Sequence, residues 1–280
     1  MSTKVFLIII CGALLHAIWN AMVKKEKDKY LSITAIVLGH IPIAVVIILL
    51  TPTPSIQSLP YIFISAIFLT GYEWCLLSAY RLDDYTKVYP VARGSAPIFI
   101  VMLAWFIFDL KISKFELLGI LIISAGIITL CFQNLIKIKN NSAILYALGT
   151  GMFISLYSTS DGYGGKISAS PLSYTAWLLI LNALIFMILL KVINKSDVIK
   201  KVFIEGKKVF FVGGTFSYTA YAVVVWAFTH VSFPVVAAVR ETNIVFSILL
   251  GSLFLKERFT LLRVASILII FFGVVLIKFY

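Results

Sequence analysis

The stretch VYPVARGSAPIFIVMLAWFIF, from Val88 to Phe108, places an arginine, a glycine and two prolines at the head of a long apolar run. A run of roughly 20 mostly apolar residues is long enough to cross a bilayer as a helix. A charged side chain at mid-membrane costs about 2.5–3.5 kcal/mol on insertion scales, so Arg93 is expected to face a partner or a water-filled cavity. The stretch therefore predicts a membrane helix that borders an internal polar site.

The composition of the whole chain supports the same class. Of its 280 residues, 61% are hydrophobic and 13% are charged, whereas soluble domains are about half apolar and about a quarter charged. The net charge of +12 lies mainly in short loops, where lysine and arginine set the orientation and contact lipid headgroups. The expected partners are the lipid bilayer and a small-molecule substrate, not nucleic acid. The three cysteines are scattered, which argues against a disulfide framework or a metal site.

Apolar segments of spanning length recur along the chain. We count ten, near residues 4–23, 31–51, 59–80, 86–108, 115–135, 142–162, 170–193, 208–229, 232–255 and 259–279.

Basic residues are distributed unevenly between the two sets of loops. One set carries KKEKDK after the first segment and the polar stretch from Lys191 to Lys208. Because cytoplasmic loops are enriched in lysine and arginine, this set is expected to be cytoplasmic, and both termini are predicted to be extracytoplasmic. The stretch from Lys191 to Lys208 is interpreted as a loop or an interfacial segment.

The two halves of the chain show an internal repeat. A shift of 147 positions, without gaps, places Arg93 on Arg240 and Gly126 on Gly273. Five predicted segments separate the copies, and because five is odd the second copy enters the membrane from the opposite side. Inverted repeats of this kind are common in alternating-access transporters. The predicted fold is therefore an all-α integral membrane protein of ten transmembrane helices, arranged as two inverted five-helix repeats (5+5), residues 1–140 and 141–280.

Three stretches carry a resemblance to a known family: LLHAIWNAMVKK (14–25), AYRLDDYTKVYPVARGSAPIFI (79–100) and YSTSDGYGGK (157–166). Together with the ten-segment plan, they resemble EamA-type members of the drug/metabolite transporter superfamily over the whole chain. The resemblance implies a multi-pass carrier in the cell (inner) membrane for small metabolites such as amino acids, amines or nucleosides, moved in or out. It also implies an acidic residue at Asp161, with glycines after it. Glu73 has no counterpart in the second half, where the repeat places Ala220.

Prolines mark corresponding places in the two halves. Pro90 and Pro97 are expected to kink the fourth helix around Gly94, and Pro234 is expected to do the same at the start of the ninth. Prolines free backbone carbonyls, which are tolerated in a membrane where they line a cavity. The two bends are therefore predicted to mark the binding region.

Glu73 lies deep in the predicted third helix, within FLTGYEWCLLSAY. At helical spacing it shares a face with Thr70, Leu77 and Tyr80. The carboxyl group is predicted to bind the amine of a substrate or to carry the coupling proton. The alternative is a structural role, as the partner of an arginine on another helix.

Arg93 and Arg240 hold equivalent positions in the two halves. By helical spacing Arg93 shares a face with Tyr89, and Arg240 shares one with Asn243. The planar guanidinium suits carboxylates and related anions, so these four residues are predicted to line the substrate site.

Both arginines also have structural interpretations. Arg93 could pair with Glu73 or Asp161 and tie two helices together. Arg240 could pair with its neighbour Glu241 in the same way. A further alternative places either guanidinium at a helix end, next to lipid headgroups.

The first helix carries a polar face formed by Gly12, His16, Trp19 and Asn20. His16 is predicted to bind substrate or relay protons, since the ordinary pKa of histidine is near 6.5; the alternative is a hydrogen-bonded packing residue. Trp19 can stack on a cation, and Asn20 can bond across helices or to the substrate. His40, in the second helix, is interpreted as structural.

The sixth and eighth helices supply three more candidates. Tyr157 and Asp161 share one face and precede Gly162 and further glycines, which suggest an unwound end or hinge; the alternative is an extramembrane turn. Tyr221 lies on one face with Gly214, and a tyrosine hydroxyl inside a membrane needs a hydrogen-bond partner. All three are predicted to contact the substrate.

These residues predict a secondary active transporter that is not an enzyme and uses no cofactor or metal. Because the predicted site holds both acids and arginines, the expected substrate is a small zwitterion such as an amino acid, moved by alternating access with proton coupling or exchange. The alternatives are a carrier of cationic amines or drugs and a lipid flippase. An intramembrane enzyme is disfavoured, because the chain has no metalloprotease, nucleophile-elbow or phosphate-loop motif. Both a monomer and a homodimer are compatible with the sequence.

Overall fold

The computed structural model describes residues 1–83, 85–135, 140–255 and 260–279. Within these residues the chain is helical and has no β-strand. The elements of the first half are α1 (Thr3–Lys25), α2 (Lys29–Leu50), the 3-10 turn η1 (Ile56–Ser58), α3 (Leu59–Leu82), α4 (Tyr85–Phe106) and α5 (Lys114–Leu135). Those of the second half are α6 (Asn141–Ile167), α7 (Pro171–Val192), α8 (Asp197–Ile204), the π-helical turn η2 (Val209–Gly213), α9 (Gly214–Phe228), α10 (Phe233–Arg240), α11 (Asn243–Leu255) and α12 (Leu261–Phe279).

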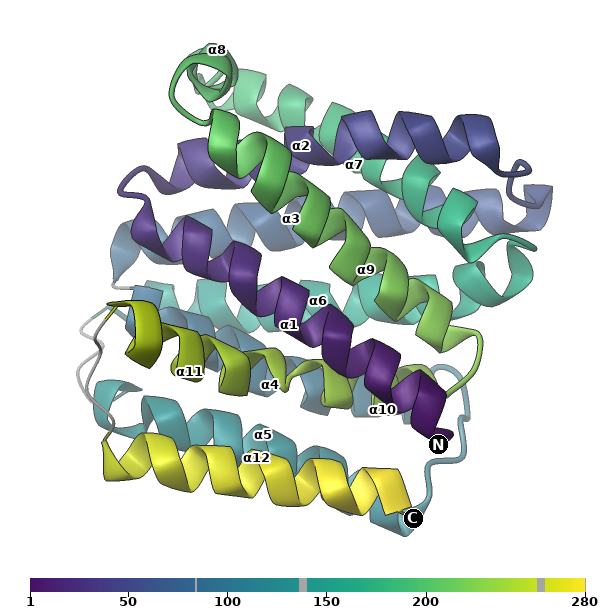
Figure 1. Ribbon diagram of the computed structural model, residues 1–280, viewed down its shortest axis with the longest axis vertical. Coiled ribbons are helices and arrows are strands. Elements are labelled where there is room, and N and C mark those ends of the chain that lie inside the picture. Colours follow the sequence, from purple (N-terminus) through teal and green to yellow (C-terminus); the bar gives the residue numbers. More distant parts are fainter. Residues whose placement is uncertain (84, 136–139, 256–259, 280) are drawn as a thin grey trace.

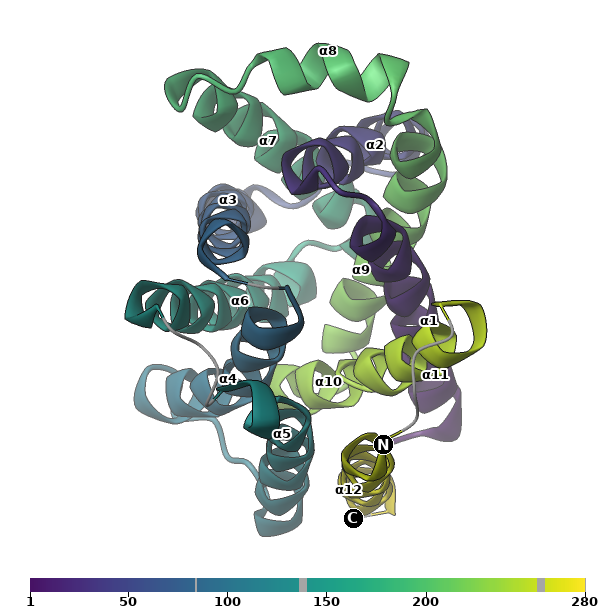
Figure 2. The ribbon, with the colours of Figure 1, turned by 90° about the vertical axis from the view of Figure 1, so that its left-hand side faces the viewer.

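The long helices run side by side in one bundle (Figure 1). Figure 2 looks along them: α2 and α7 lie near one edge beneath α8, and α5 and α12 lie at the opposite edge. Between these pairs, α3, α6 and α4 occupy one side, and α9, α1 and α11 occupy the other. The two termini meet at one end of the bundle, where Lys278 Nζ donates hydrogen bonds to the Met1 carbonyl (3.0 Å) and the Thr3 hydroxyl (3.1 Å).

In the described part of the chain, eight helical segments are long and apolar enough to cross a membrane. They correspond to eight of the ten predicted segments; α5 and α6 occupy the other two, near 115–135 and 142–162, and are not among the eight. The side chains are arranged as a lipid environment requires, with large apolar ones on the outside and charged ones buried. Phe272 on the outside is 61% exposed, whereas Arg93 and Glu241 are 3% and 0% exposed. Soluble proteins almost never bury charges and expose large apolar side chains on this scale.

The stretch between Lys191 and Lys208 contains α8, which lies across the direction of the bundle helices (Figures 1 and 2). Its buried residues Val198 and Val202 pack beside α2, within a cluster that includes Ala35. This polar stretch therefore forms a short helix against the bundle rather than an irregular loop throughout.

Of the two predicted bends, the one in the second half differs from what is observed, and the kink in α4 stays a prediction. α4 continues as a helix through both Pro90 and Pro97. In the second half the helix is broken, but not at Pro234: α10 ends at Arg240 and α11 begins at Asn243. Pro234 lies in the first turn of α10, where its missing N–H would have had no helical partner anyway. The prediction of a bend at Pro234 is therefore wrong in position.

The glycines of α6 are packing residues. α6 stays helical through Gly162, Gly164 and Gly165, so the predicted unwound end and the alternative of an extramembrane turn are both wrong. A Cβ atom at Gly162 would lie 2.8 Å from the Cβ of Phe233, and one at Gly164 would lie 2.6 Å from the ring of Tyr174. The missing side chains let α10 and α7 approach α6 closely.

α2 and α9 cross with their backbones in contact. A Cβ atom at Gly39 would lie 2.1 Å from the carbonyl oxygen of Phe210 and 3.0 Å from the Cα of Gly214. The π-helical turn η2 comes just before Gly214, and its wider turn shifts the following side chains around the helix axis. Ser217 and Tyr221, which follow this turn, face the interior of the bundle.

Replacing Gly39 with alanine is expected to destabilise the protein by about 1–3 kcal/mol, because the added methyl group overpacks against a backbone carbonyl that cannot rotate away. The measurement is the unfolding free energy in detergent. Gly149→Ala is the matched control: its Cβ would meet only Cys75 Sγ, at 3.3 Å, and the expected change is under about 1 kcal/mol. Equal stability of Gly39→Ala and the unaltered protein would contradict the backbone contact.

Candidate functional site

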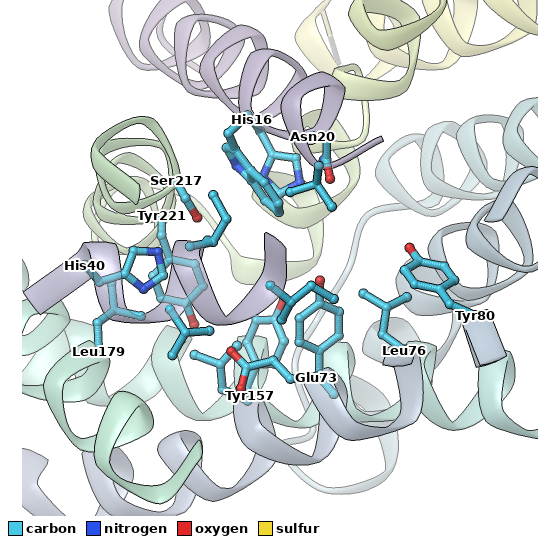
Figure 3. A pocket seen from close by; sticks show the side chains of 17 residues that line it. His16, Asn20, His40, Glu73, Leu76, Tyr80, Tyr157, Leu179, Ser217 and Tyr221 are labelled. Atoms are coloured by element: carbon cyan, nitrogen blue, oxygen red, sulfur yellow. The ribbon is translucent and has the colours of Figure 1, made fainter. Parts of the chain in front are cut away.

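A pocket opens among α1, α2, α3, α6, α7 and α9 and encloses about 770 Å³, its mouth included. Six of the eleven predicted site residues line the pocket: His16, Trp19, Asn20, Glu73, Tyr157 and Tyr221. Figure 3 labels five of the six, all except Trp19, and shows them converging from different helices, with Glu73 and Tyr157 between His40 and Tyr80 in this view.

Glu73 supplies the carboxylate of this pocket and is 5% exposed. Its Oε2 accepts a hydrogen bond from Asn182 Nδ2 (3.2 Å), and the same amide group donates to the Thr70 hydroxyl (3.1 Å). Within the described residues, no lysine, arginine or histidine forms an ion pair with Glu73. The alternative of an arginine partner for Glu73 is therefore wrong: among the described residues, its carboxyl group is held by the neutral amide of Asn182.

Aromatic rings form much of the remaining wall. Tyr72 and Tyr157 lie with ring centroids 5.9 Å apart, and Tyr157 and Tyr221 lie 6.0 Å apart. Trp19 and Tyr80 also line the pocket, and none of its described lining residues is a lysine or an arginine. The faces of aromatic rings attract cations, so the pocket offers one carboxylate within an aromatic surround.

The two arginines lie outside the pocket and share one acid. Arg93 Nε is 3.1 Å from Glu241 Oε2, and Arg240 Nη2 is 3.6 Å from Glu241 Oε1. Glu241 sits at the break between α10 and α11, whereas Arg93 belongs to α4. The Arg240–Glu241 pair was one of the structural alternatives, and it is present. Arg93 pairs with neither Glu73 nor Asp161, which corrects the corresponding alternative.

Arg93 reaches the pocket indirectly. Its Nη2 lies 3.3 Å from His16 Nε2, and because a guanidinium only donates hydrogen bonds, His16 Nε2 is the acceptor and Nδ1 carries the ring proton. The Arg93 guanidinium lies 5.8 Å from the centre of the Tyr89 ring, and the Tyr89 hydroxyl accepts a hydrogen bond from Asn20 (3.1 Å). From outside the pocket, Arg93 thus contacts His16 and Tyr89 contacts Asn20. The proton relay through His16 stays a prediction.

Asp161 and Asn243 also lie outside the pocket wall. Asp161 Oδ1 accepts hydrogen bonds from Ser65 (2.6 Å) and Tyr174 (3.0 Å), and its Oδ2 accepts one from Tyr221. Asn243 donates to the Arg240 carbonyl (2.9 Å), next to the helix break. Asp161 therefore positions Tyr221, and Asn243 stabilises the backbone beside Glu241.

Several lining residues were missing from the predicted set. His40, which the sequence suggested was structural, lines the pocket, together with Tyr72, Tyr80 and Ser217. Asn182, behind Glu73, was also missed; it is a buried amide in a strongly apolar segment, and that contrast was the available sign of a role, whereas Glu241 was considered only as the partner of Arg240. Among the described residues, no group of three His, Cys, Asp or Glu side chains could hold a metal ion.

Comparison with known protein families identifies the family of this chain. Residues 141–279 match the EamA-like transporter family. The chain belongs to the EamA-like transporter family. Membership, together with the apolar helices, makes it a multi-pass membrane protein and points to a transporter rather than an enzyme.

Other comparisons bear on the fold of this EamA-like transporter. A solved structure titled "Crystal structure of protein" superposes on it with a TM-score of 0.76 at 15% sequence identity, covering 100% of this chain and 99% of that one. At this identity the match shows a shared fold and nothing about substrate. A search of curated proteins finds no match.

Proposed function

We propose that the protein is a secondary active transporter that carries a small organic cation, such as an amine, by alternating access through the pocket around Glu73. The supporting observation is the buried Glu73 carboxylate, which has no cationic partner among the described residues and faces a wall of aromatic rings. A positively charged group would supply the missing counter-charge, and the tyrosine and tryptophan faces would surround it.

A zwitterionic substrate, which the sequence predicted, is less well supported than a cationic one. Neither Arg93 nor Arg240 lines the pocket, and both lie at ion-pair distance from Glu241. To bind a substrate carboxylate, Arg93 would have to leave Glu241 in a buried site, which is costly. We therefore rank the cationic substrate, an alternative at the outset, above the amino-acid-like one.

The ten-span, inverted 5+5 arrangement is part of the proposal, with α5 and α6 as the two additional spans. The packing supports equivalent halves: α1 contacts α9 and α11, and correspondingly α6 contacts α3 and α4. α2 packs on α7, and α5 packs on α12, so each of these is paired with its own counterpart. Gly126 lies against Ile270 of α12, and the equivalent Gly273 lies against Ile123 of α5. The family match begins at residue 141, where the second half is proposed to start.

The position of the pocket supports alternating access. Its α1 residues lie from His16 to Val23 and its α2 residues from Ile33 to His40, so it occupies the half of the bundle near the lysine-rich α1–α2 connection. In the other half, apolar packing closes the bundle around Ile9 and Phe233. If the basic loops lie on the cytoplasmic side of the cell (inner) membrane and the termini lie outside, the pocket is on the cytoplasmic side and the structure is an inward-facing state. Glu73 would bind a proton or the cation in turn, which couples the two as an exchange.

A transport assay tests this function. Proteoliposomes containing the protein are expected to take up phenyltrimethylammonium, a permanent cation that does not diffuse through lipid, in a saturable manner driven by an acidic interior. Phenylalanine, a zwitterion with a similar ring, is expected to be taken up at least about tenfold more slowly, because the described residues of the pocket wall include no lysine or arginine for its carboxylate. Faster uptake of phenylalanine than of phenyltrimethylammonium would contradict the proposed substrate class and favour a zwitterion.

A further inference from the structure

His40 lies in the pocket wall with both ring nitrogens unpaired. The side chain is 6% exposed, and neither Nδ1 nor Nε2 has a hydrogen-bond partner among the described residues. Buried polar groups in native proteins are nearly always hydrogen-bonded, and each exception needs an explanation. A group that enters the pocket would provide one.

The side chains next to His40 do not supply hydrogen bonds to its ring nitrogens. Its ring meets Tyr218 edge-on with centroids 6.5 Å apart, and the Tyr218 hydroxyl is itself buried without a partner. The Tyr221 hydroxyl, on the same side of the pocket in Figure 3, donates to Asp161 instead. A second unpaired donor, the indole Nε1 of Trp19, also belongs to the pocket wall.

The backbone beside His40 is fixed. Gly39 contacts the backbone of Phe210 and Gly214 at the crossing of α2 with η2 and α9. The backbone of His40 is therefore held beside the pocket, since α2 cannot shift here without separating these helices. Its imidazole is held at a set place, apart from the carboxylate of Glu73, to which no hydrogen bond connects it.

We propose that His40 forms a second subsite, which binds a neutral polar group of the substrate while Glu73 binds the cationic group; this rests on the proposed function. A neutral imidazole offers one donor and one acceptor, and a hydroxyl group both donates and accepts, so the two are complementary. The substrate class is then cations that carry a hydroxyl, such as amino alcohols and hydroxylated aromatic amines.

The test compares the affinities of the purified protein for matched cations that differ by one hydroxyl, by isothermal titration calorimetry. The pairs are tyramine with phenethylamine, and choline with ethyltrimethylammonium. The hydroxylated member of at least one pair is expected to bind about tenfold more tightly, the size of one hydrogen bond in a desolvated site. His40→Phe is expected to reduce this preference to less than about twofold while the plain cation still binds.

Two further variants make the result interpretable. His40→Gln keeps a donor and an acceptor, so it is expected to retain part of the preference even if His40→Phe fails to fold. His230→Phe changes an exposed histidine outside the pocket and is expected to leave both affinities unchanged.

The outcomes separate this proposal from the proposed function. If Glu73→Gln weakens both members of a pair but His40→Phe keeps the hydroxyl preference, the His40 subsite is wrong and the cation site stands. A lack of preference in the unaltered protein for every pair would also overturn the subsite and would mean that His40 bonds only to water. If Glu73→Gln changes neither affinity, the proposed cation site itself fails.

Discussion

Glu73→Gln is expected to reduce uptake of phenyltrimethylammonium into proteoliposomes about a hundredfold. Glutamine keeps the shape of the side chain and its contact with Asn182, but it cannot carry the negative charge that the cation needs. In the part of the chain that the structure describes, no other carboxylate lines the pocket, and Asp161 and Glu241 are engaged elsewhere. Removing one partner of a desolvated charge pair costs about 2–5 kcal/mol, which corresponds to this loss.

Two matched variants show whether the charge itself is responsible. Glu73→Asp keeps the charge at a shorter reach and is expected to retain measurable uptake. Glu205→Gln removes an exposed carboxylate at the end of α8 and is expected to transport normally. If Glu73→Gln transports at the rate of the unaltered protein and with the same dependence on the pH gradient, Glu73 neither binds the cation nor couples it to protons.

Glu241→Gln is expected to lower the stability of the protein by about 3–5 kcal/mol. Arg93 and Arg240 both lie at ion-pair distance from this carboxylate, and all three side chains are buried. Without it two buried guanidinium groups would lose the carboxylate that they share, and breaking a buried pair in this way is among the more destabilising single changes. The measurement is the free energy of unfolding in detergent, with the amount of folded protein in the membrane as a second readout.

A double variant tests the cause of this loss. Arg93→Gln with Glu241→Gln removes one positive and one negative charge together, so the buried cluster keeps its original net charge. The double variant is expected to be more stable than Glu241→Gln alone, because interacting residues have non-additive effects. If the losses from the two single changes simply add, Arg93 and Glu241 do not stabilise each other and the observed ion pair is not important for the fold.

Much of the fold follows from local sequence. The ten apolar segments correspond to helical segments within a few residues, except that the one near 232–255 is divided into α10 and α11. A chain in lipid must satisfy its backbone hydrogen bonds inside each segment, which favours helices. The polar face of the first helix was also predictable: His16, Trp19 and Asn20 line one pocket because residues three and four apart lie on one side of a helix. Gly12, on the same face, packs against Val223 of α9 instead.

The predictions that were wrong concern contacts between helices. Arg93 could be matched with several acids from the sequence, and the choice of Glu241 over Glu73 depends on where α4 faces the break after α10. The glycines of α6 suggested a hinge because glycine weakens an isolated helix, but Phe233 and Tyr174 occupy the space that their side chains would take. His40 looked structural because its helix is otherwise apolar.

The sequence alone determined that the protein lies in a membrane, where its helices are, which family it belongs to and which residues share a polar helix face. These features depend on composition and on spacing along one segment. Tertiary structure decided which charges pair, where the helix after Pro234 breaks, and that His40 faces the same pocket as Glu73. Those features depend on the rotation and depth of helices relative to one another. They are fixed by contacts such as Gly39 with Phe210, between residues far apart in the chain.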